Sequence, residues 1–193
     1  SRGGVTVLVD DLNSRSMSVL EPRGSAELWR ADICDDGGQA RDGSLAVVDG
    51  VAVAAFECVD GIHTAQIDDA GSVTTVLPAP ASGELAIHPT GLALARREKG
   101  VDGDAIVLRD TRLGDVVVEL IGSSDVDSRW IEFSPDGRIV LAIGAGDVHG
   151  WDATNGALLG SIDACGFISD VAFRPDTDEL VIGCFEEPLA IVS

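Results

Sequence analysis

Apolar residues along this chain come in short runs that are cut by glycine, aspartate and proline. Clear examples lie at residues 51–58, 92–95, 139–143 and 180–184. Runs of this kind between turn-forming residues are typical of strands joined in hairpins. Several are apolar at nearly every position, which predicts strands that neighbouring sheets cover on both faces. No window keeps a helical period long enough for a core helix, so the pattern predicts an all-β protein.

Two kinds of turn recur along the chain. The first contains proline and follows the opening strand of a unit, as Ile-His-Pro-Thr-Gly at 87–91, Phe-Ser-Pro-Asp-Gly at 133–137 and Phe-Arg-Pro-Asp-Thr at 173–177. Proline presets φ, aspartate or threonine bonds to the local backbone, and glycine accepts a positive φ. The second turn comes later in each unit and is clearest at 108–114 and 150–156. A pattern that returns about every 40 residues indicates a repeat architecture.

The repeats predict a single β-propeller domain or fragment, whose blades are four-stranded antiparallel sheets. Looser copies of the turns at 66–71 and 19–24 extend the pattern toward the N-terminus. The expected blades are residues 1–31 (partial), 44–78, 84–121, 128–162 and 168–193 (partial). About three full blades and two incomplete ones do not close a ring of four to eight blades. We therefore expect a fragment or processed product of a longer propeller, or half of a split one.

The unit from Ser128 to Ile162 resembles the WD-repeat family of β-propellers. It has the Phe-Ser-Pro-Asp-Gly turn and a Trp-Asp pair followed by Thr-Asn-Gly, and Trp151 matches the strand-ending tryptophan of the family. Arg109 stands at the equivalent place in the preceding unit, and the family's Gly-His pair is absent. The turn at 144–147 is short, so the family's Asp–His–Ser–Trp network is not carried over. The resemblance implies a non-catalytic protein-interaction scaffold or sensor module within a larger protein.

The resemblance also implies where a partner binds. In such propellers, the loops that enter the innermost strands lie on one face, which often takes partner peptides. This mapping places Arg129 and Trp130 in one such loop, and Ser169 and Asp170 in the next. Arginine and tryptophan are both enriched at interface hot spots. The alternative is that Trp130 packs between blades and Arg129 is a solvated loop charge.

Charge narrows the classes of partner. The formal net charge is −20, and such a field repels nucleic acid and anionic membranes and steers a basic protein partner. An acidic, salt-tolerant or high-GC bacterial proteome is the alternative origin of the charge. Self-association, or a complementary chain that completes the propeller, is a further expectation. No apolar stretch approaches the 18 or more residues that a membrane span needs.

The four cysteines are Cys34, Cys58, Cys165 and Cys184. They form no Cys-x-x-Cys pair and show no metal-ligand rhythm with histidine. Cys58 and Cys184 end apolar runs, which predicts buried thiols, although disulfides are left open. Reduced cysteines favour a cytoplasmic protein, and a processed N-terminus could still have removed a signal peptide.

Residues with catalytic potential do not form a convincing site. The glycines at 144–150 look like a dinucleotide-binding turn, but a strand end and a turn follow instead of the required helix. His63, His88 and His149 have no triad spacing with a nucleophile, so we expect structural roles. Acidic pairs such as Asp35–Asp36 and Asp125–Asp127 lack the calcium-loop pattern and fit solvated turns. We predict no catalytic residue, cofactor or metal ligand. The alternative function is a propeller-type enzyme or a small-ligand or metal binder, with a central-channel site that leaves little linear motif.

Overall fold

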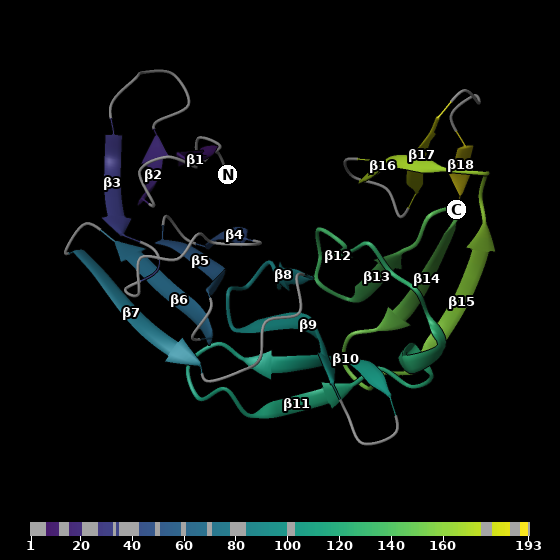
Figure 1. The fold of residues 1–193 in the computed structure, drawn as a ribbon, viewed down its shortest axis with the longest axis horizontal. Coiled ribbons are helices and arrows are strands. Elements are labelled where there is room, and N and C mark those ends of the chain that lie inside the picture. The colour runs from purple at the N-terminus through teal and green to yellow at the C-terminus, as the bar shows by residue number, and fades with distance from the viewer. Residues whose placement is uncertain are drawn as a thin grey trace.

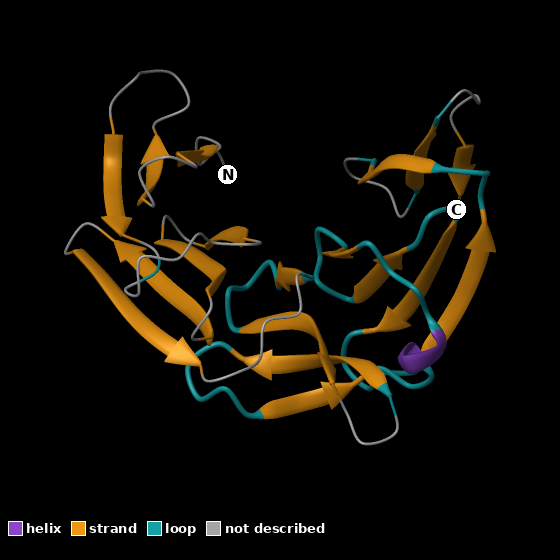
Figure 2. Ribbon diagram, in the orientation of Figure 1, coloured by secondary structure: helices purple, strands orange, loops and turns teal. Residues whose placement is uncertain are grey.

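The chain folds into five antiparallel sheets within the residues that a computed structural model describes. The described residues are 7–11, 16–20, 27–32, 34, 43–48, 51–58, 61–68, 71–77, 84–99, 103–174, 179–185 and 190–192. Apart from the short 3-10 helix η1 (Ser123–Asp125), the elements in these ranges are strands (Figure 2). The predicted all-β class is confirmed.

Each sheet is a meander whose strands pair in chain order. The first contains β1 (Val7–Asp11), β2 (Ser16–Leu20) and β3 (Glu27–Asp32). The second contains β4 (Gly43–Val48), β5 (Val51–Cys58), β6 (Gly61–Asp68) and β7 (Gly71–Leu77). The third contains β8 (Leu85–Ile87), β9 (Ala93–Lys99), β10 (Asp104–Asp110) and β11 (Val116–Glu119). The fourth contains β12 (Trp130–Phe133), β13 (Ile139–Ile143), β14 (Asp147–Asp152) and β15 (Leu158–Asp163). The fifth contains β16 (Ile168–Phe173), β17 (Leu180–Cys184) and β18 (Ala190–Val192).

The sheets follow one another around an open arc (Figure 1). Strands β4, β8 and β12 lie on the inner side of the arc, and β7, β11 and β15 lie on its outer side. This radial arrangement of four-stranded meanders is that of β-propeller blades. The expected blade limits include residues outside the described ranges, and so does the end of the proline turn at 173–177.

Successive residues of the second strand of a sheet pack against different neighbouring sheets. In β13, Val140 and Ala142 belong to the apolar cluster shared with the third sheet. Leu141 and Ile143 belong to the cluster shared with the fifth sheet. Because side chains alternate between the faces of a strand, a strand covered on both faces must be apolar at every position. This explains the nearly continuous apolar runs in the sequence.

The proline turns bring consecutive sheets into contact. In the turn after β12, Gly137 has a φ of 74°, and its carbonyl oxygen lies 3.0 Å from Nε2 of His88 in the turn after β8. The His88 ring also meets the Phe133 ring edge-on, with 5.1 Å between centroids. A Cβ atom at Gly137 would lie only 2.1 Å from His88 Nε2. Glycine is therefore required here both by the backbone and by the neighbouring sheet.

The residue before the second recurrent turn makes different contacts in two successive units. Trp151 is fully buried, and its Nε1 donates a hydrogen bond to the Ile121 carbonyl oxygen of the preceding unit at 2.9 Å. Arg109, at the equivalent place, instead pairs with Glu98 inside its own sheet, with 2.7 Å between Nη2 and Oε2. Tryptophan thus joins two units, whereas arginine stabilises one. The same position of the repeat therefore carries two chemically different side chains, because each makes a different contact.

Replacing Gly137 with alanine should cost more than about 3 kcal/mol, because strain from positive φ adds to the collision with His88. Gly122→Ala is the control for φ alone, since Gly122 has a φ of 75° and open space around its Cβ position, and it should cost about 1–2 kcal/mol. Gly160 has open space and no positive φ, so Gly160→Ala should be neutral or stabilise by up to about 1 kcal/mol. Urea unfolding measures all three.

A His88→Ala background separates the two causes. There the cost of Gly137→Ala should fall to that of Gly122→Ala, because the colliding ring is gone. An unchanged cost in that background would show that the contact between the two turns does not constrain the glycine.

Candidate protein-interaction surface

The four residues predicted to bind a partner lie where the fourth and fifth sheets meet. Arg129 directly precedes β12, and its backbone N–H donates to the Ile143 carbonyl oxygen at 2.7 Å. Trp130 opens β12 and is half-buried, because it packs against the cluster between the two sheets. Ser169 and Asp170 lie in β16, at a shift in its pairing with β17. Their side chains are exposed, as is that of Arg129.

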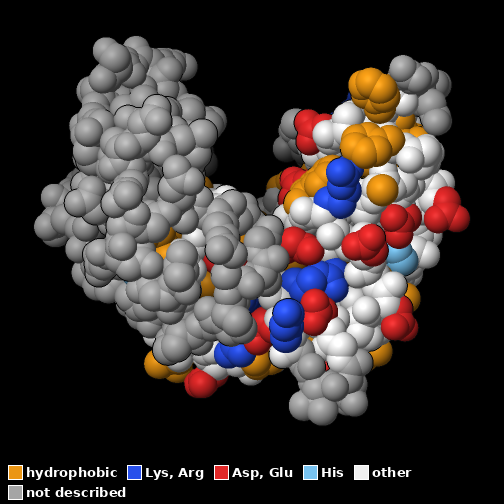
Figure 3. All heavy atoms as spheres, in the orientation of Figure 1, with side chains coloured by type: hydrophobic (Ala, Val, Ile, Leu, Met, Phe, Trp, Pro, Cys, Tyr) orange, Lys and Arg blue, Asp and Glu red, His pale blue; other side chains and the backbone are white. Residues whose placement is uncertain are grey.

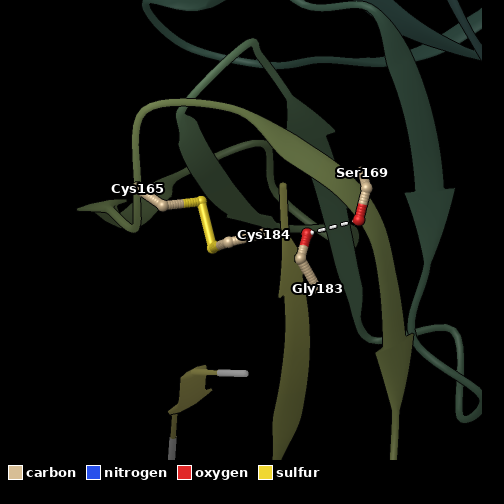
Figure 4. Close-up of a disulfide and its surroundings, with 4 residues drawn as sticks. All are labelled: Cys165, Ser169, Gly183 and Cys184. Atoms are coloured by element: carbon tan, nitrogen blue, oxygen red, sulfur yellow. Dashed lines mark hydrogen bonds between the residues drawn. A yellow bond between two sulfur atoms is a disulfide. The ribbon is translucent and has the colours of Figure 1, made fainter. Parts of the chain in front are cut away.

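The shift in β16 turns Ser169 toward the neighbouring strand. Its Oγ donates to the Gly183 carbonyl oxygen at 2.9 Å (Figure 4). The Asp170 carboxylate accepts the Val171 backbone N–H at 2.9 Å. Irregularities of this kind re-aim side chains, and they are common beside binding sites.

Two phenylalanines that the sequence reading missed complete the surface. The guanidinium carbon of Arg129 lies 4.5 Å from the centroid of the Phe167 ring. Phe167 meets Phe185 in a T-shaped arrangement, with centroids 6.5 Å apart. The two rings are 43% and 63% exposed, so two of the five phenylalanines of the chain are displayed in one place. We call Arg129, Trp130, Phe167, Ser169, Asp170 and Phe185 the junction surface. Figure 3 shows hydrophobic side chains beside a cationic one at this end of the arc.

The loop that carries Arg129 is fixed by the third sheet. Arg97 in β9 donates to Glu84 Oε1 at 3.1 Å and to the Val126 carbonyl oxygen at 2.8 Å. The Ser128 hydroxyl donates to the same Glu84 carboxylate and accepts from Arg97. Charge-assisted bonds such as these hold a loop in one geometry. Arg129 is therefore presented from a constrained backbone.

The cysteines are paired, which corrects the prediction of reduced thiols. Cys34 bonds to Cys58, and Cys165 bonds to Cys184, with Cα atoms 5.7 Å and 6.2 Å apart. The first bond links the residue after the first sheet to the end of β5, and the second ties the segment before β16 to the end of β17 (Figure 4). The first bond joins two different sheets, whereas the second closes the open end of the β16–β17 hairpin. The spacing along the chain does not show which cysteine ends come within bonding distance.

The second disulfide ties together the two backbone segments that carry the aromatic rings. Phe167 follows Cys165 by two residues, and Phe185 directly follows Cys184. The Phe185 backbone N–H also donates to the Phe167 carbonyl oxygen at 2.9 Å. Closing a loop with a sequence separation of 19 residues is worth about 3 kcal/mol by loss of chain entropy in the unfolded state.

A half-buried carboxyl group interacts with the junction surface. Glu132, in the middle of β12, has its pKa raised from 4.5 to about 7, mainly because burial penalises its charged form. The charge of Asp170 raises it further. The predicted binding residue Asp170 is thus electrostatically coupled to the inner strand of the adjacent sheet.

The other candidate groups occupy structural positions. The glycines at 144–146 form the tight connection between β13 and β14, and a Cβ at Gly146 would lie 2.2 Å from the Cys165 carbonyl oxygen. His149 stacks on Trp151 and bonds to Asp147 at 2.7 Å. Asp125 and Asp127 are exposed, and Asp35 and Asp36 lie outside the described residues. Among the described residues, no group of three His, Cys, Asp or Glu side chains is placed to hold a metal ion. No helix in the described ranges is long and apolar enough to cross a membrane.

The fold resembles known propellers. Hsv2 of Kluyveromyces lactis aligns with a TM-score of 0.67 and 12% identity, over 93% of this chain and 55% of that one. KlHsv2 with loop 6CD replaced by a Gly-Ser linker aligns with a TM-score of 0.69 and 12% identity, over 98% and 61%. The Dos1 propeller aligns with a TM-score of 0.62 and 13% identity, over 91% and 51%.

These likenesses show the fold alone, which is β-propeller-like. The chain spans 51% to 61% of the length of these structures. The sequence matches no family model and no curated protein.

The raised pKa of Glu132 predicts how stability depends on pH. Between pH 4.5 and about 7, the folded state keeps a proton that the unfolded state releases, so stability falls as pH rises through this window. Glu132→Gln removes the cost of charging the buried group. It should therefore stabilise the protein at pH 8 by about 1–2 kcal/mol, after allowance for solvent screening, and have little effect at pH 4.5. Denaturant unfolding across this range measures the difference.

Glu119→Gln removes an exposed carboxylate in β11 and is the matched control. If Glu132→Gln behaved like Glu119→Gln, Glu132 would not be the group that titrates at neutral pH.

Proposed function

We propose that this chain is a non-catalytic protein-interaction module of WD-like propeller type, part of a larger protein, and that it binds a protein partner at the junction surface. The observation that supports it best is the exposed set of Arg129, Phe167 and Phe185 at the meeting of two sheets. Arginine and aromatic residues supply much of the binding energy of protein interfaces. Exposed aromatic rings also gain a large apolar burial when a partner covers them.

Preorganisation supports the same proposal. A disulfide holds both rings, and the ion pair of Arg97 with Glu84 holds the loop before Arg129. A rigid surface loses little conformational entropy on binding, so more of the contact energy appears as affinity. The two disulfides favour an oxidising compartment over the cytoplasmic location predicted from the sequence.

A row of apolar residues on the fifth sheet supports the proposal that this chain is part of a larger propeller. Ala172, Val181 and Ile191 lie side by side across β16, β17 and β18, and Ile191 is 61% exposed. Val181 corresponds to Leu141 by its distance from the proline turn, and Leu141 is buried against the next sheet. We propose that a further blade of the larger protein covers this row, as its counterpart is covered.

Affinity capture with the intact oxidised chain tests the partner proposal. Phe167→Ser combined with Phe185→Ser, or Arg129→Ala alone, should weaken partner capture at least about tenfold, because each removes a central contact. The matched control is Leu158→Ser with Leu159→Ser. These two leucines are 52% and 60% exposed but lie on the outer strand β15, and their replacement should leave capture unchanged.

If the junction variants still captured the partner and the leucine variant did not, the interface would lie on the outer strands instead. Turnover of a small substrate by the wild-type chain, with no protein partner captured, would contradict the proposed class of function.

A further inference from the structure

We infer that the junction surface recognises a partner segment carrying an Asp or Glu carboxylate beside an apolar side chain. Arg129 binds the carboxylate, and Phe167 and Phe185 receive the apolar group. The inference rests on the proposed function, since it names the chemistry of the partner at the same surface.

The ionic state of Arg129 is the first support. Lysine and arginine number 13 in this chain, against 33 aspartates and glutamates, so an arginine has many acidic side chains available. Several arginines use them, in the pairs Arg96–Glu98, Arg97–Glu84, Arg109–Glu98, Arg138–Asp136 and Arg174–Glu179. Within the described part of the chain, the side chain of Arg129 has an aromatic contact but no ion pair and no hydrogen bond. Its N–H donors are left for a partner.

The shape of the Arg129 guanidinium indicates which chemical group it binds. A guanidinium is planar and carries five N–H donors in a fixed fork, which matches the two oxygens of a carboxylate. Its position 4.5 Å from the Phe167 ring centroid is within the range of cation–π attraction, which is worth about 0.5–1 kcal/mol at an exposed site. The contact with the ring restricts the arginine side chain. An oriented arginine of this kind favours bidentate pairing.

The aromatic pair specifies the neighbouring residue of the partner. Phe167 lies next to both Arg129 and Phe185. A side chain that covers the exposed rings therefore lies within about one residue of the group that meets Arg129. A large aliphatic or aromatic residue directly beside the carboxylate fits this spacing. The disulfide between Cys165 and Cys184 keeps the spacing fixed.

The group that Arg129 binds has the opposite charge to the molecules that the net charge of the protein attracts. A charge of −20 steers basic molecules from a distance, whereas the contact at Arg129 selects an acidic group at close range. The exposed Asp170, which belongs to the junction surface, suits a basic residue flanking that group. A segment with one carboxylate, an adjacent apolar residue and basic flanks satisfies both requirements.

Selection from a display library of random twelve-residue peptides, about 10⁹ sequences, on the intact oxidised chain tests the inference. We expect enrichment of Asp or Glu next to an aromatic or large aliphatic residue. In a synthetic peptide from the selected set, Asp→Asn or Glu→Gln should weaken binding at least about tenfold, as loss of a charged hydrogen-bonded contact does. Arg129→Gln should weaken binding of the acidic peptide equally. It should have little further effect on the amide peptide, because the two changes remove the same contact.

The matched control is Arg112→Gln. Arg112 is exposed in the turn after β10, away from the junction surface, and its replacement should leave the affinity of the acidic peptide unchanged. Arg129→Lys should restore only part of the affinity, since an ammonium lacks the fork.

The possible outcomes separate the two proposals. If the peptides need Phe167 and Phe185 but show no dependence on Arg129 or on the carboxylate, the proposed interaction surface stands and carboxylate recognition is wrong. If no peptide is enriched, or if enriched peptides ignore both the rings and Arg129, both proposals are contradicted. A phosphoserine in place of the acidic residue that binds tenfold more tightly would overturn the assignment in favour of phosphate.

Discussion

Packing between consecutive sheets is the interaction on which the rest of this structure depends. A meander of three or four strands has two apolar faces here, and neither can be buried within the sheet itself. The strand β13 therefore contributes alternate residues to two different clusters, as Leu141 and Ala142 do. The order of the sheets around the arc follows from this pairing of faces. A single blade removed from its neighbours would expose both of them to water.

Several charged residues lie between or beside the packed sheets. Arg97 and Glu84 pair where the third and fourth sheets meet, and they hold the loop before β12. Arg96 is fully buried on the opposite face of β9. Burial lowers its pKa, while Glu98 and Glu57 oppose that shift. The pKa of Glu132 is raised, also mainly because of burial. Sheet packing thus sets the positions of these groups. The junction surface takes its residues from the fourth and fifth sheets, and Arg97 of the third sheet fixes the loop before it.

Much of the fold could be predicted from the sequence, because the signals are local. Apolar runs and proline turns are properties of a few neighbouring residues, and they gave the all-β class and the repeat. Phe167, Phe185 and the disulfides could not be predicted in the same way, because each depends on the register in which strands pair and sheets meet rather than on neighbouring residues. Arg129 was found by its place in the repeat. The contact that gives it a role, with Phe167, comes from the next blade, and the exposure of Trp130 is limited by that same blade.

The central claim is that partner binding occurs where the fourth and fifth sheets meet. Hydrogen–deuterium exchange of the intact chain, with and without a captured partner or selected peptide, tests it most directly. Binding at the junction surface should slow exchange in peptides covering residues 127–132, 165–170 and 183–185, and leave the outer strands β11 and β15 unchanged. Slowed exchange confined to β11 and β15, with no change at the junction, would contradict the claim.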